Sequence, residues 1–140
     1  MKLTAKDKEL IEAATKAIKS RYRNDWQEVG AALRTRDGRL VVGVNLDAYV
    51  GRGAVCAEAV AIGTALTDKG DQGIDTIVAV RHPKPGEKGD IAVVSPCGAC
   101  RELIHDYDAK ARVIVPNGTK GPEVVSIGEL LPNKYRRGLS

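Results

Sequence analysis

Several features that mark particular protein classes are absent or scarce in this chain of 140 residues. It has no phenylalanine and one tryptophan, so its core must be built from valine, isoleucine, leucine and alanine. No apolar run approaches the roughly 18–20 residues of a membrane-spanning helix, and no membrane partner is expected. The opening segment MKLTAKDKELIEAAT is charged throughout and lacks the apolar stretch of a signal peptide, so we expect a cytoplasmic protein.

Cysteine is also scarce, with three residues in the whole chain. An odd cysteine count without an export signal argues against a disulfide framework. The net charge of +4 comes from basic and acidic residues that are interspersed, apart from a short basic tail at 134–137. This pattern is typical of a solvated surface, and no nucleic-acid partner is expected.

The apolar pattern predicts alternating helices and strands in a single domain, residues 1–140. Helices are expected at 4–19, 56–66, 97–107 and 128–131, and strands at 29–36, 39–45, 74–81, 112–115 and 124–125, with 91–94 short and extended. Thr4 and Asp7 predict a capping box at the first helix, and Asp37-Gly38 predicts a type I′ hairpin turn with two positive φ angles. This order predicts a three-layer α/β/α sandwich with a five-stranded mixed sheet.

All three cysteines stand at predicted helix starts. Cys97 and Cys100 form a C-x-x-C pair, which alone fits a redox dithiol, half of a structural zinc site, or part of a catalytic zinc site. Zinc takes about four tetrahedral ligands, and Cys56 supplies a third thiolate. His82 lies in a loop and His105 lies off the cysteine face of its helix, so neither is expected as the fourth ligand. An open fourth position, where water binds, is typical of catalytic zinc.

Glu58 follows Cys56 by two residues and lies in the first turn of the same predicted helix. Zinc lowers the pKa of bound water from about 15.7 towards about 7, and an adjacent carboxylate can pass the released proton to a substrate nitrogen. The alternative is that Glu58 is only an acidic residue favoured by the helix dipole. The positive ends of two helices would also offset the negative charge of three thiolates and lower their pKa values.

The segments Cys56-Ala57-Glu58 and SPCGACR (residues 95–101) resemble the zinc signature of the cytidine deaminase superfamily. Within it, the segments VCAEAVAIGTA, DTIVAVRHP, VVSPCGACREL and ELLPNKY are most similar to the blasticidin-S deaminases. The resemblance implies hydrolytic loss of ammonia from a cytosine ring, one zinc ion per subunit, and a homotetramer whose neighbouring subunits help to close each site.

The resemblance also implies roles for individual residues. Cys56, Cys97 and Cys100 would hold zinc, and Glu58 would transfer the proton. The residues implied in substrate binding are Asn45 and Asp47, in the place of a ribose-binding pair, the backbone of Ala57, the carbonyl of Ser95, and Tyr135.

Two positions depart from the cytidine deaminase pattern. Gln27 stands where those enzymes usually carry a phenylalanine that stacks on the base. Ala59 stands where an arginine commonly follows the motif glutamate. Both departures count against ordinary cytidine as the best substrate, whereas Asn45 and Asp47 favour a sugar.

The expected function is therefore zinc-dependent deamination of a free cytosine nucleoside, blasticidin S or a similar compound, with a role in antibiotic resistance. The alternatives are a cytidine or deoxycytidine deaminase of pyrimidine salvage and a non-catalytic binding module that zinc stabilises.

Overall fold

The computed structural model of the chain describes residues 1–138. Its helices are α1 (Ala5–Arg21), α2 (Ala57–Lys69), α3 (Gly98–Tyr107) and α4 (Ile127–Leu130). Its strands are β1 (Val29–Arg34), β2 (Leu40–Val44), β3 (Thr76–Arg81), β4 (Ala92–Val94), β5 (Arg112–Val115) and β6 (Glu123–Ser126). Two single turns of 3-10 helix, Gly51–Gly53 and Gly118–Lys120, lie in loops. None of the helices within 1–138 is long and apolar enough to cross a membrane.

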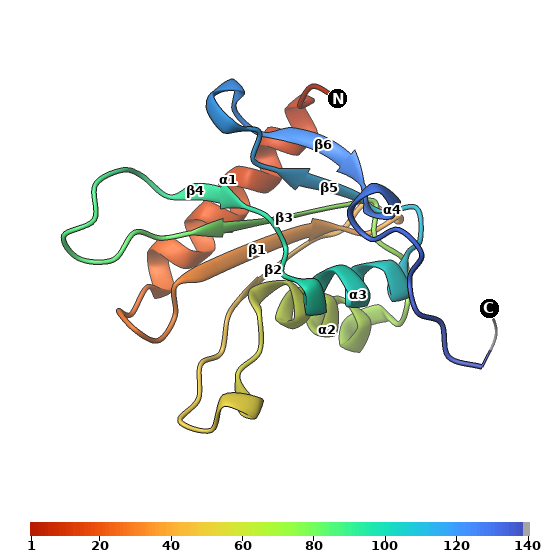
Figure 1. Ribbon diagram of the computed structural model, residues 1–140, viewed down its shortest axis with the longest axis horizontal. Helices are drawn as coiled ribbons and strands as arrows, with labels where there is room; N and C mark the ends of the chain where they lie inside the picture. Colours follow the sequence, from red (N-terminus) through yellow and green to blue (C-terminus); the bar gives the residue numbers. More distant parts are fainter. Residues whose placement is uncertain (139–140) are drawn as a thin grey trace.

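The sheet separates α1 on one face from α2 and α3 on the other (Figure 1). The continuous strand order is β2-β1-β3-β5-β6, and β3 pairs with β5 in parallel while the other pairs are antiparallel. The predicted α/β sandwich with a mixed sheet is thus confirmed. Within the described residues a sixth strand, β4, pairs with the second half of β3. The extended segment 91–94 therefore joins the sheet, because the half of β3 beyond its pairing with β5 has hydrogen-bonding groups free.

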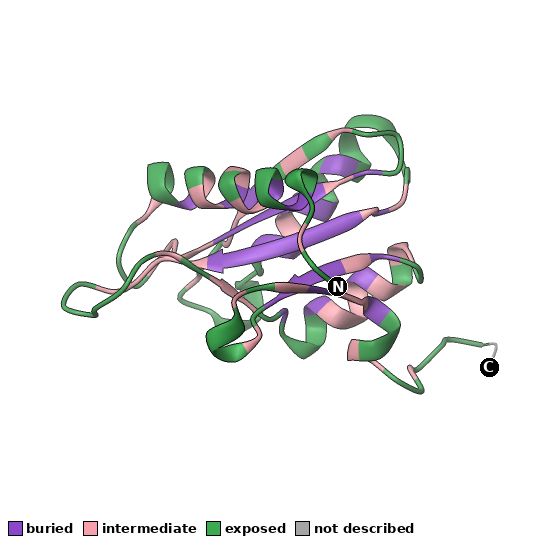
Figure 2. Ribbon diagram, turned by 90° about the horizontal axis from the view of Figure 1, so that it is seen from above, coloured by how far each residue is buried: buried purple, intermediate pink, exposed green. Residues whose placement is uncertain are grey.

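Each face of the sheet buries its own cluster of apolar residues. Figure 2 shows buried residues, in purple, along the central strands. Along β3, Ile77 and Ala79 pack on the α2 and α3 side, whereas Val78 and Val80 pack on the α1 side. This alternation follows from the two-residue period of a strand. It explains why β3 is apolar at successive positions, since both of its faces are covered.

Two local predictions, the cap of α1 and the turn between β1 and β2, have opposite outcomes. Thr4 and Asp7 form the expected capping box, with the Asp7 amide 3.2 Å from Thr4 Oγ1 and the Thr4 amide 2.9 Å from Asp7 Oδ2. The predicted type I′ turn between β1 and β2 is wrong, because Gly38 has a φ of +91° but Asp37 has no positive φ. The Gly38 amide donates to the Thr35 carbonyl, which gives a longer hairpin loop ending in a left-handed glycine.

Gly43 of β2 allows the start of α2 to lie directly on the sheet. A Cβ atom at this position would lie 2.7 Å from the amide nitrogen of Ala61 and 3.0 Å from the carbonyl oxygen of Ala57. Both contacts are with helix backbone, which cannot rotate away as a side chain can. The close approach fixes the first turn of α2, where Cys56 and Glu58 lie, against the sheet.

The Gly43→Ala substitution is expected to destabilise the protein by about 1–3 kcal/mol, since the added methyl group overpacks the contact with α2. The free energy of unfolding, measured by urea denaturation, tests this. Gly63→Ala is the matched control, because Gly63 is an exposed residue of α2 with open space around its Cβ position. It should stabilise the helix by roughly 0.5–1 kcal/mol. Equal stabilities of G43A and the unmodified protein would contradict the close approach.

Candidate active site

The three cysteines meet where the first turns of α2 and α3 converge. Cys56 and Cys97 are the N-cap residues of α2 and α3, and Cys100 lies in the first turn of α3. Their Sγ atoms all lie within 4.8 Å of one another, and those of Cys56 and Cys97 are 3.6 Å apart. In a tetrahedral zinc site with Zn–S bonds of about 2.3 Å, the sulfur atoms lie about 3.8 Å apart. The thiol spacing therefore fits a zinc ion.

Within residues 1–138 these cysteines are the only group of three or more His, Cys, Asp or Glu side chains spaced to hold a metal ion. His82 instead stacks on Tyr22, with ring centroids 3.7 Å apart. The chain therefore offers three ligands of the soft thiolate type that zinc accepts. No fourth His, Cys, Asp or Glu side chain joins this group at metal-ligand spacing in the part of the chain that the structure describes.

The surroundings of the three thiols differ. Burial raises the pKa of Cys56, and burial together with the Glu58 carboxylate raises the pKa of Cys100. Burial also opposes ionisation of Cys97, but the Cys100 backbone amide and the other two thiols lower the pKa of Cys97 below its ordinary value. Only thiolates bind metal, so a bound cation must supply the charge that allows Cys56 and Cys100 to ionise.

Glu58 lies in the first turn of α2 beside the thiols and is 5% exposed. Burial raises the pKa of its carboxyl group, although a backbone hydrogen bond and the Cys100 thiol act in the opposite direction. The carboxyl group therefore holds a proton at higher pH than a solvated glutamate does. It faces the same cavity as Cys56 and Cys97.

This cavity has a volume of about 330 Å³, within the range of small-molecule sites. It lies between the starts of α2 and α3 and the loop that follows β2. Its lining residues are Val29, Asn45, Leu46, Asp47, Ala54, Val55, Cys56, Ala57, Glu58, Val94, Ser95 and Cys97. Four of the five residues implied in substrate binding, Asn45, Asp47, Ala57 and Ser95, are thus brought together with the thiols.

Asn45 lines the cavity, but its side chain is occupied by backbone groups. Its Oδ1 accepts from the amides of Glu28 and Val29 at 2.8 and 2.9 Å, and its Nδ2 donates to the Trp26 carbonyl at 2.9 Å. These bonds hold the segment that leads into β1. One oxygen of Asp47 accepts from the Ala48 amide at 2.7 Å.

Tyr135 does not line the cavity in a single chain. It is 73% exposed and lies beside Glu102, Asp106 and Lys134, at the end of α3 opposite to the cysteines. Lys134 holds this segment through ion pairs of 2.9 Å to Glu102 and 2.7 Å to Asp106. The chain itself therefore separates Tyr135 from the other implied substrate residues.

Sequence reasoning missed the apolar wall that the loop after β2 contributes. Leu46 and Val55 pair through two backbone hydrogen bonds of 2.9 and 2.8 Å, which close the loop at its base and place both residues on the cavity. Their only signal in the sequence is that two apolar residues flank a loop rich in glycine. That pattern does not specify pairing between them.

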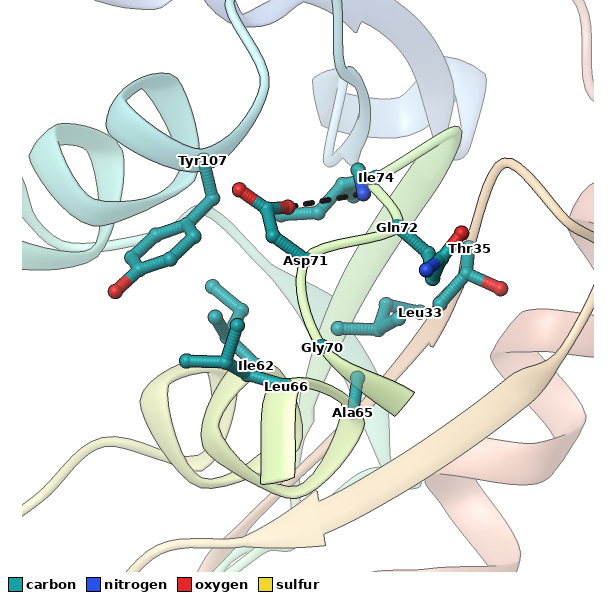
Figure 3. Close-up of a pocket in the computed structure, with 11 residues that line it drawn as sticks. Leu33, Thr35, Ile62, Ala65, Leu66, Gly70, Asp71, Gln72, Ile74 and Tyr107 are labelled. Carbon is teal, nitrogen blue, oxygen red and sulfur yellow. Dashed lines mark hydrogen bonds between the residues drawn. The ribbon is translucent and has the colours of Figure 1, made fainter. Parts of the chain in front are cut away.

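A second cavity, between α2, the end of α3 and the loop before β3, has a different character (Figure 3). Leu33, Ile62, Leu66 and Tyr107 contribute to its lining, and its volume is about 20 Å³, which is room for roughly one water molecule. Asp71 at its edge accepts a hydrogen bond from the Gly73 amide at 3.1 Å. It is a packing void too small for a substrate.

Comparison with known proteins agrees with this geometry. The sequence matches the family described as the cytidine and deoxycytidylate deaminase zinc-binding region over residues 4–116. It is 46% identical over 136 residues to a blasticidin-S deaminase of Bacillus cereus, covering 96% of both chains. It is 30% identical over 110 residues to a cytidine deaminase of Sporosarcina psychrophila, covering 78% of this chain and 75% of that protein.

A solved structure of a cytidine deaminase is also similar to this chain. The cytidine deaminase of Burkholderia pseudomallei superposes with a TM-score of 0.75 at 30% sequence identity, covering 95% of this chain and all of the other. Together with the three thiols at zinc spacing, these likenesses show that the chain belongs to the cytidine and deoxycytidylate deaminase family and holds its zinc ion with Cys56, Cys97 and Cys100.

Proposed function

We propose that this zinc-dependent deaminase converts the cytosine ring of a free nucleoside to uracil with release of ammonia, and that blasticidin S or a similar nucleoside is its substrate. The observation that carries the proposal is the position of Glu58, a buried carboxyl group in the same cavity as Cys56 and Cys97, two of the three thiols at zinc spacing. The likeness to a blasticidin-S deaminase over 96% of the chain supports the choice of substrate.

Glu58 carries the protons in the proposed reaction. Zinc, when bound, supplies a Lewis acid that makes water nucleophilic at neutral pH. Glu58 takes the proton that water loses as its oxygen bonds to C4 of the ring, and passes this proton to N3. Glu58 then takes the remaining proton of the new hydroxyl group and gives it to the amino group, so that the C4–N bond breaks and ammonia leaves. The raised pKa of Glu58 suits these transfers near neutral pH.

The remaining lining residues would orient the ring. In this proposal the backbone amide of Ala57 and the carbonyl of Ser95 contact the polar edge of the base. Val29, Val55 and Val94 are cavity residues that offer apolar surface to its faces. Gln27 donates to the Asn45 carbonyl at 3.5 Å and does not line the cavity, so aliphatic side chains take the place of an aromatic ring.

The charge of the cavity supports a free nucleoside over a nucleotide. Asp47 and Glu58 are the charged side chains among its lining residues, and neither lysine nor arginine lines it. A 5′-phosphate would enter without a basic partner and close to two carboxyl groups, which is unfavourable. Deoxycytidylate is therefore expected to be a poor substrate.

The proposal includes the oligomeric state of the protein. We expect residues 1–140 to act as one deaminase domain in a homotetramer, with Tyr135 of one subunit near the cavity of another. Exposed aromatic and apolar side chains support this, since Tyr49 is 99% exposed on the loop beside the cavity and Tyr135 is distant from the cavity of its own chain. A cytoplasmic location is also part of the proposal, because a reducing compartment keeps cysteines available as metal ligands.

Replacement of Glu58 by glutamine should leave zinc bound and lower the turnover of blasticidin S and cytidine by at least about a hundredfold, because the amide cannot transfer the protons. Loss of absorbance of the cytosine ring measures turnover, and metal analysis measures zinc. Glu129→Gln is the control, since Glu129 is also an acidic residue in the first turn of a helix but is exposed and outside the cavity. Normal turnover in E58Q would exclude the proposed role.

A panel of blasticidin S, cytidine, deoxycytidine and deoxycytidylate tests the substrate. We expect blasticidin S to give the highest kcat/KM and deoxycytidylate the lowest, at least about tenfold below cytidine because of repulsion in the acidic cavity. A higher kcat/KM for cytidine than for blasticidin S would favour the salvage function instead. Absence of turnover with every member, in a zinc-loaded protein, would favour a non-catalytic zinc module.

A further inference from the structure

Arg101 links the turn that carries Cys97 to the C-terminal part of the chain. Its Nε donates to the Pro96 carbonyl at 2.9 Å, and its Nη1 donates to the Leu130 carbonyl at 3.1 Å. Pro96 is buried and directly precedes the zinc ligand Cys97. Leu130 is the last residue of α4. One guanidinium group therefore joins two segments that are 34 residues apart in sequence, as the residue numbers give.

Both carbonyl groups need a donor from outside their own element. The carbonyl of Leu130 lies at the C-terminal end of α4, where carbonyls have no partner within the helix and favour a positive charge. Pro96 lies before the first residue of α3, and proline has no N–H with which to anchor the turn itself. A carbonyl shielded from water that loses its hydrogen-bond donor is left unsatisfied, which is unfavourable.

The turn of residues 95–97 has few other restraints. Within residues 1–138, Arg101 is the side chain that donates a hydrogen bond to the backbone of this turn. The Cys97 carbonyl accepts from the Arg101 amide at 2.9 Å, which belongs to the start of α3. The same turn contributes Ser95 and Cys97 to the cavity wall.

We propose that Arg101 is a positioning residue, which holds the 95–97 turn so that Cys97 retains zinc and the Ser95 carbonyl keeps its place in the cavity. Through Leu130 it makes this placement depend on the docking of α4. The arginine fork suits the task because two of its nitrogens reach two carbonyls at once, whereas the single ammonium group of lysine does not present a planar pair of donors.

The competing explanation is that Arg101 only stabilises the fold. Arg36 provides the matched control, because it performs a similar task at the other end of α3. Its Nε lies 2.8 Å from Asp108 Oδ2, and its Nη2 donates to the Lys110 carbonyl at 3.3 Å. Loss of Arg36 should loosen the end of α3 that is distant from the cysteines, while the 95–97 turn keeps its contacts.

The test is the rate of zinc release from the loaded protein into a chromophoric chelator, at a temperature where circular dichroism shows every variant folded. Arg101→Ala is expected to release zinc about 10–100-fold faster than the unmodified protein. Arg101→Lys should give an intermediate rate, and Arg36→Ala should leave the rate unchanged. If Arg101→Ala does not fold, the Arg101→Lys rate alone tests the proposal.

The proposal fails if Arg101→Lys or Arg101→Ala releases zinc at the normal rate, or if Arg36→Ala accelerates release as much as Arg101→Ala does. Steady-state kinetics give a second readout, since displacement of Ser95 should raise KM in Arg101→Lys but not in Arg36→Ala. The inference rests on the zinc site and, for the Ser95 contact, on the proposed function. Zinc release requires no substrate, so a wrong substrate assignment would not affect that result.

Discussion

The convergence of two helix N-termini on three sulfur atoms is the constraint on which the site depends. Cys56 and Cys97 are N-cap residues, so their side chains lie where helix amides are free and the backbone carries partial positive charge. Without a cation, burial and the Glu58 carboxylate keep the Cys100 thiol protonated. The zinc ion and the two helix ends together offset the negative charge of the three thiolates. Two contacts position these helix starts. Gly43 allows α2 to lie directly on the sheet, and Arg101 donates a hydrogen bond to the turn before α3.

Features that depend on neighbouring residues were predictable from the sequence. The Thr4 and Asp7 capping box, the apolar run of β3 and the helix starts at the cysteines all follow from short-range chemistry. The predicted type I′ turn is wrong because Gly38 follows the central residues Arg36 and Asp37 of a longer loop, and an Asp-Gly pair is compatible with both loops. The pairing of β4 with β3 and the Arg101 link require partners distant in sequence, which periodicity cannot specify.

Asn45 shows why a motif position does not by itself give a residue's role. The sequence allowed either a sugar contact or the end of a strand, and the side chain uses both its oxygen and its nitrogen to hold residues 26–29. In this arrangement Asn45 shapes the cavity through the backbone that it fixes, including Val29 on the wall. Asp47, by contrast, has one carboxylate oxygen without a backbone partner among the described residues and lies on the same cavity. Of the two, Asp47 is the better placed to contact a substrate directly.

The zinc ligands and the outer wall of the cavity lie on different parts of the chain. The ligands and Glu58 lie on helix starts that are packed against the sheet, whereas Leu46, Asp47, Ala54 and Val55 lie on a loop whose base the Leu46–Val55 pair closes. Substitutions in that loop can change which nucleoside fits while the thiols keep their spacing. The chain shares one family pattern with relatives of two different names, a blasticidin-S deaminase at 46% identity and a cytidine deaminase at 30% identity. We therefore propose that the helix ends constrain the reaction and that the loop facing them selects the substrate.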